Sequence, residues 1–74
     1  MAFKRAILQD EANIGTLIHE IRKKQGMTLR ELSAKSGATE SAISRYESGQ
    51  RVPTTRTFFS ILDALGAELY ILHN

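Results

Sequence analysis

The hydrophobic positions of this chain fall into two stripes with helical spacing, one in each half of the sequence. The first stripe consists of Ile14, Leu17, Ile18 and Ile21. Intervals of three and four residues place these side chains on one face of a helix. The pattern predicts a helix over residues 13–25, with Asn13 as its N-cap and Gly26 at its end.

The second stripe lies near the C-terminal end and has the same spacing. It consists of Phe58, Ile61, Leu62 and Leu65. Phe59 is expected to widen this stripe, and Thr54 or Thr55 to cap its helix after Pro53, with Gly66 ending it.

Two shorter helices are predicted between the stripes. Thr28 and Glu31 have the spacing of a capping box, which starts a helix that Gly37 ends. Thr39 is a good N-cap for the next helix, and Gly49 can stop it. Two short helices joined by a tight glycine turn form a helix-turn-helix.

The second helix of this pair is unusually polar. Only Ala42, Ile43 and Tyr46 are apolar, so the helix buries little and is poorly stable alone. Such a helix is useful when its outer face is read by a partner, and in a helix-turn-helix that partner is the major groove of DNA.

The two ends of the chain differ from the helical middle. Residues 1–9 alternate weakly as a strand does, but a disordered tail or a helix start fits them equally well. The run Leu69, Tyr70, Ile71 and Leu72 is strand-like, and a single strand leaves its backbone groups unpaired. It predicts a homodimer that shares a small sheet; the alternative is a frayed apolar end.

Together these patterns predict an all-α fold, a compact bundle of four to five helices that contains the helix-turn-helix. They also predict a short C-terminal β-strand that pairs across a homodimer. The chain divides into an N-terminal arm (1–12), a DNA-binding domain (13–66) and a dimerisation strand (67–74). The stripes are expected to close over Ile43, Leu32 and Ile18.

Composition narrows the classes of function. Seventy-four residues allow one small domain, and the chain has no cysteine and only two histidines, far apart. This inventory predicts no metal, no cofactor and no enzymatic site. No run of eighteen apolar residues and no signal-peptide pattern occur, so we expect a cytoplasmic, nucleoid-associated protein without a membrane span.

The net charge of +2 is compatible with DNA binding without arguing for it. Several cations nevertheless gather in or beside the helix-turn-helix: Arg30, Lys35, Arg45, Arg51 and Arg56. They are read either as ordinary solvated side chains or, with the helix-turn-helix, as a phosphate-facing patch.

From Ile14 to Gly66 the chain resembles the DNA-binding domain of the Cro/C1-type (XRE) regulators. The resemblance is carried by small Ser33, turn Gly37, Ile43, the sequence Glu47-Ser48-Gly49, and Pro53. It departs from the family at Leu29, where Gln is frequent, and at Ser33 and Ser36, where Ala and Leu are usual.

The resemblance implies which residues meet DNA. Base edges would be met by Thr39, Glu40, Ser41, Ser44 and Arg45, and phosphates by Thr28, Arg30, Arg51 and Thr54. The fork of Arg45 suits the O6 and N7 acceptors of guanine. Glu40 either accepts from cytosine N4 or only complements the helix dipole. Arg22 and Glu47 would form a partly buried structural ion pair.

A closer resemblance concerns the segment from Thr54 to Leu72, which is similar to the matching part of HipB antitoxins. It implies an antitoxin that binds a HipA-like kinase toxin, acts as a dimer on a two-fold operator in double-stranded DNA, and autorepresses its operon. The alternatives are a stand-alone repressor and a protein-interaction adaptor that no longer reads DNA.

Overall fold

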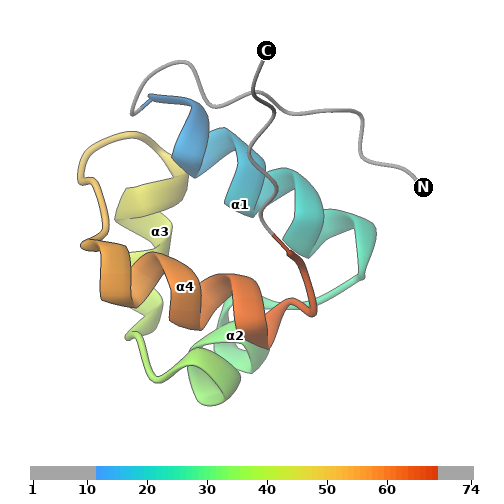
Figure 1. The fold of residues 1–74 in the computed structure, drawn as a ribbon. Helices are drawn as coiled ribbons and strands as arrows, with labels where there is room; N and C mark the ends of the chain where they lie inside the picture. Colours follow the sequence, from blue (N-terminus) through green and yellow to red (C-terminus); the bar gives the residue numbers. More distant parts are fainter. Residues whose placement is uncertain (1–11, 69–74) are drawn as a thin grey trace, which may run out of the picture.

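The fold is taken from a computed structural model that describes residues 12–68. This part of the chain forms four helices around one core (Figure 1). They are α1 (Ala12–Lys24), α2 (Leu29–Ser36), α3 (Glu40–Glu47) and α4 (Thr55–Ala64). The all-α prediction is confirmed. The predicted N-terminal arm, up to residue 11, and the strand at Leu69–Leu72 lie outside the described residues.

Threonine side chains begin three of the helices. Thr28 forms the predicted capping box with Glu31, Thr39 accepts the backbone N–H of Ala42, and Thr54 rather than Thr55 caps α4. The prediction of Asn13 as the cap of α1 is wrong, because Ala12 already has helical geometry and Asn13 lies inside the helix. The preference of a side chain for the N-cap position locates the start of a helix only to within one or two residues.

Each helix contributes one fully buried side chain to the centre of the core. These are Ile18 from α1, Leu32 from α2, Ile43 from α3 and Ile61 from α4. Burying one such side chain is worth about 1.5–3 kcal/mol. The expectation that the stripes close over Ile18, Leu32 and Ile43 is confirmed.

Phe59 does not join this core, contrary to expectation. Phe58 is 7% exposed, whereas Phe59 is 50% exposed. Successive residues of a helix point about 100° apart, so only one of the two rings can face inward. Phe58 is the one in register with Ile61, Leu62 and Leu65, at three, four and seven residues further on.

The turn between α2 and α3 is braced by two serines. Gly37 has φ 84°, a left-handed conformation that glycine adopts readily, and its N–H donates to the Ser33 carbonyl. The Ser33 hydroxyl donates to the Ala38 carbonyl at 2.6 Å, and the Ala38 N–H donates to the Ser36 hydroxyl at 3.2 Å. Two of the three family departures, Ser33 and Ser36, therefore satisfy backbone groups of the turn and help to fix α3 against α2.

α1 packs against α3, while α2 packs against both α3 and α4. At Gly15, which is buried, α1 lies close to the α3 backbone: a Cβ atom there would overlap the Tyr46 carbonyl. At its other end, α1 is joined to α4 because the Gln25 side-chain amide donates to the Leu65 carbonyl. α3 is thus held from two sides, and its remaining side faces solvent.

Candidate nucleic-acid interface

α3 divides its side chains sharply between core and solvent. Ile43 and Tyr46 are buried and anchor the helix. The five predicted base-contacting residues are all exposed: Thr39, Glu40, Ser41, Ser44 and Arg45. Because the fold uses the other face of α3, these side chains are available to a partner without any change in packing.

The chemistry of this outer face is mixed. Among the described residues Arg45 forms no ion pair, so its donors are available to acceptors on a partner. The Thr39 hydroxyl accepts the Ala42 N–H at 3.0 Å and keeps its own proton for donation. Glu40 lies in the first turn of α3, where a carboxylate complements the helix dipole.

The four predicted phosphate contacts come from three elements. Thr28 and Arg30 lie at the start of α2, Arg51 lies in the loop after α3, and Thr54 caps α4. All four residues are exposed. They are thus spread along the chain, unlike the base-contacting set, which is confined to α3 and its cap.

The two threonines of this set differ in what they can still offer a phosphate. The Thr28 hydroxyl accepts the Glu31 N–H at 3.0 Å and retains its proton, whereas the Thr54 hydroxyl donates to Thr57 Oγ1 at 3.0 Å. The Thr28 backbone N–H is also occupied, because it donates to Glu31 Oε1 at 2.8 Å. The hydrogen bonds that Glu31 forms with the backbone and the side chain of Thr28 lower the pKa of the Glu31 carboxyl. Of the two donors of Thr28, the backbone N–H is used by Glu31, and only the hydroxyl is free to donate to a phosphate.

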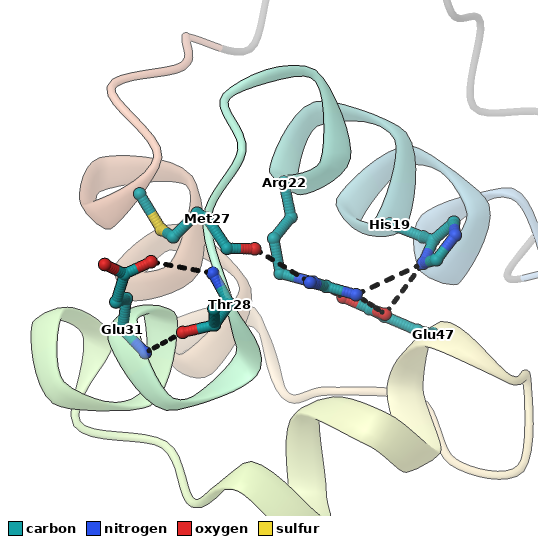
Figure 2. Close-up of polar contacts among 6 residues, drawn as sticks. All are labelled: His19, Arg22, Met27, Thr28, Glu31 and Glu47. Carbon is teal, nitrogen blue, oxygen red and sulfur yellow. Dashed lines mark hydrogen bonds and ion pairs between the residues drawn. The ribbon is translucent and has the colours of Figure 1, made fainter.

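The last residue of α3 is clamped to α1 (Figure 2). Arg22 Nε donates to Glu47 Oε2 at 2.7 Å, and Arg22 Nη2 donates to Glu47 Oε1 at 2.9 Å. Arg22 Nη1 donates to the Met27 carbonyl at 2.8 Å. Arg22 is only 8% exposed, so the pair is largely removed from water. Charge-assisted bidentate bonds are among the strong hydrogen bonds, and they are stronger when they are shielded from water.

His19 is a third member of this clamp that the sequence analysis missed. Its Nδ1 lies 2.9 Å from Glu47 Oε1 and 3.5 Å from Arg22 Nη2. The short contact with a carboxylate requires that Nδ1 carries the proton and donates. His19 and Arg22 lie three residues apart and so share a face of α1, which is the one signal in the sequence that links them.

The charges of the clamp shift both pKa values. Burial opposes the charged form of Glu47, but the hydrogen bonds from Arg22 and His19, together with their charges, outweigh it, so the pKa of Glu47 is lowered. The hydrogen bond to Glu47 raises the pKa of Arg22 despite the opposing effect of burial. The pair is therefore ionised at neutral pH.

Known proteins resemble this chain in sequence and in fold. The family model described as Helix-turn-helix matches residues 18–72. A curated relative from Sinorhizobium fredii (strain NBRC 101917 / NGR234), the uncharacterized HTH-type transcriptional regulator y4dJ, is 34% identical over 53 residues, which cover 72% of this chain and 69% of the relative. The chain belongs to the helix-turn-helix family of Cro/C1 (XRE) type. It is a DNA-binding transcriptional regulator, and such regulators are typically not enzymes.

Two solved structures resemble this helix-turn-helix protein. The clp gene regulator ClgR from C. glutamicum is 33% identical with a TM-score of 0.72, covering 78% of this chain and 74% of ClgR. A HipB variant in complex with an O2 20mer is 25% identical with a TM-score of 0.82, covering 97% of each chain. Within residues 12–68, none of the helices is long and apolar enough to cross a membrane.

Removal of the Glu47 carboxylate is expected to destabilise the helix-turn-helix domain. Glu47→Ala leaves Arg22 buried without its counter-ion, a change that costs about 3–5 kcal/mol. Chemical denaturation would measure the loss, and base preference should change little because Glu47 is not on the outer face of α3. An unchanged melting temperature together with abolished DNA binding would contradict this role. The double variant Arg22→Met/Glu47→Leu should lose less than the two single variants added together.

The stability of the domain should also depend on pH through Glu47. Because its folded-state pKa is lowered, Glu47 contributes stability above the ordinary glutamate pKa of 4.5, and this contribution is lost as the pH falls through the lowered value. The difference in unfolding free energy between the parent and Glu47→Gln should therefore shrink on acidification below about pH 4.5. Glu31 titrates in both proteins and cancels. A difference that stays constant to pH 2 would exclude the effect.

Proposed function

We propose that this regulator is the DNA-binding antitoxin of a HipBA-like toxin–antitoxin system. In this proposal it neutralises a HipA-like kinase toxin and represses its own operon as a dimer. The observation that carries the proposal is the likeness to the HipB variant bound to an O2 20mer, which extends over 97% of both chains. The segment from Thr54 to Leu72 also supports it by its resemblance to HipB antitoxins.

DNA reading is assigned to the outer face of α3. Ser41, Ser44 and Arg45 are exposed, while the opposite face of the helix is fixed in the core. Arg45 is the residue that we assign to a guanine, because its planar fork matches two acceptors at once. The short serines and Thr39 adapt to several bases and contribute less discrimination. Glu40 is assigned mainly to the dipole, since a carboxylate among phosphates is unfavourable.

Phosphate contacts hold the domain on the duplex without reading sequence. We assign them to Thr28, Arg30, Arg51 and Thr54. The two arginines contribute through their positive charge: Arg30 from α2, and Arg51 from the loop that follows α3. Thr28 contributes through its remaining hydroxyl proton, whereas Thr54 must give up its bond to Thr57 to donate. Thr54 is therefore the weakest of the four.

The dimer is assigned to Leu69–Leu72, whose alternation suits a strand that pairs with a second copy. A two-fold dimer reads a two-fold operator, with half-sites about 34 Å apart, one turn of the double helix. Because a DNA reader works where the DNA is, the proposal places the protein in the cytoplasm at the nucleoid. The proposal thus divides the chain into an N-terminal arm (1–12), a DNA-binding domain (13–66) and a dimerisation strand (67–74).

A stand-alone repressor is the second candidate, and the sequence identities favour it. The regulators ClgR and y4dJ are 33% and 34% identical, against 25% for the HipB variant. Neither is named as an antitoxin. The two candidates share all of the DNA-reading residues and differ only in whether a toxin is bound.

Two arginine variants test the assignment of DNA contacts. Arg45→Ala should cost about 1–3 kcal/mol of binding and relax the preference at one base pair, because it removes a base contact. Arg51→Ala should weaken binding equally on all sequences and reduce the salt slope by about 1. Binding to duplexes selected by the parent protein, titrated over a range of salt concentrations, measures both. Binding that is absent or insensitive to salt would leave the adaptor as the surviving function.

Co-purification separates the antitoxin from the repressor. The tagged protein, isolated from its native cell at moderate salt, should bring down a stoichiometric kinase-like protein encoded beside it. Mass spectrometry identifies that partner, and sequencing of the bound DNA identifies the operator. Enrichment of its own upstream DNA without any protein partner would favour the stand-alone repressor.

A further inference from the structure

Beside the clamp, α1 and the end of α3 also approach each other through their backbones, at Gly15. Gly15 is buried, and a Cβ atom at this position would lie 2.0 Å from the carbonyl oxygen of Tyr46. It would also lie 3.1 Å from the Tyr46 carbonyl carbon and 3.3 Å from the Glu47 carbonyl oxygen. All three neighbours are main-chain atoms, so no change of rotamer can relieve the overlap.

The site of this contact is the turn of α3 that the clamp also holds. Gly15, His19 and Arg22 are spaced four and three residues apart, so they form one face of α1. Gly15 meets the backbone at Tyr46 and Glu47, while His19 and Arg22 meet the Glu47 side chain. The Tyr46 side chain is itself buried at 7% exposure. The last turn of α3 is therefore fixed in position from one direction by α1.

The position of this turn sets the position of the outer face. α3 has only eight residues and is about 12 Å long, so it moves as a rigid rod. A displacement at Tyr46 is carried directly to Arg45 and Ser44, one and two residues away. Hydrogen bonds to base edges tolerate only a few tenths of an ångström, because their donor–acceptor distances span about 2.7–3.2 Å.

We propose that Gly15 is a positioning residue for DNA recognition: the absence of a side chain lets α1 touch the α3 backbone and sets where α3 presents its base-contacting residues. The proposal rests on the DNA-reading role of α3 given above. It assigns to Gly15 an effect on sequence discrimination, although Gly15 lies in the core and is not one of the residues that we assign to DNA.

The proposal differs from the role of the Glu47 clamp. Loss of the Glu47 carboxylate removes the hydrogen bonds to Arg22, but the buried side chains of Ile43 and Tyr46 still hold α3 in its place against the core. A methyl group at Gly15 instead pushes the two helices apart by about 1 Å, the distance needed to reach the 3.0 Å that Cβ atoms keep from other atoms. A side chain at Gly15 displaces α3, whereas loss of the Glu47 carboxylate only loosens it, and the two changes are therefore predicted to affect DNA binding differently.

The test compares Gly15→Ala with Ile61→Ala. Ile61 is fully buried in α4, so Ile61→Ala destabilises the domain without touching the contact between α1 and α3. Each protein is titrated, at a temperature well below its melting temperature and with its active fraction determined, against a duplex selected by the parent protein and a scrambled duplex. Gly15→Ala should lower the ratio of the two affinities about tenfold, while its salt slope on scrambled DNA stays that of the parent. Ile61→Ala should keep the parental ratio.

The outcomes are separable. An unchanged ratio for folded Gly15→Ala, or an equal fall for Ile61→Ala, would overturn the proposal. If Gly15→Ala is unfolded in buffer, the titration is repeated in sucrose, which favours compact states. Failure to fold there too would make the contact a requirement of the fold and would also overturn the proposal. A parent protein that selects no duplex would instead refute the DNA-reading role itself.

Discussion

The structure depends on holding one polar helix in a fixed place. α3 buries only Ile43 and Tyr46, and the rest of its surface is partly or fully exposed. Two buried side chains alone do not fix the orientation of a helix. The domain adds a braced turn at one end of α3 and a clamp with a backbone contact at the other. The neighbours of α3 therefore supply what its own sequence lacks.

The contacts that hold α3 are of two chemical kinds, an apolar core and a buried ion pair. The hydrophobic core joins all four helices through Ile18, Leu32, Ile43 and Ile61, and it supplies most of the stability without strong directionality. The ion pair of Arg22 and Glu47 adds direction, because bidentate bonds require one relative geometry. Burial makes the pair costly to break, because loss of one partner leaves the other charge buried alone, but the desolvation of both charges offsets much of their attraction. Its main consequence is that α1 and α3 have one favourable arrangement.

Sequence patterns gave the helices and most of their caps, because these follow from local spacing and from threonine and glycine chemistry. The core followed from the two stripes. The orientation of Phe59 did not, because adjacent aromatic residues fit a stripe equally well until packing selects one. His19 and the Ser33 hydroxyl also escaped notice, since their partners lie in other elements. Gly15 reads in the sequence only as a weak helix former, and its close contact exists only in three dimensions.

The separation of the two faces of α3 has a consequence for how such regulators diversify. Ser41, Ser44 and Arg45 contact solvent, and among the residues that the structure describes they hold no part of the core together. Mutations there change the surface offered to a duplex at little cost to folding, whereas changes at Ile43 or Tyr46 do not have this freedom. A duplicated copy of the gene could thus acquire a new target site by a few substitutions while inheriting an intact scaffold.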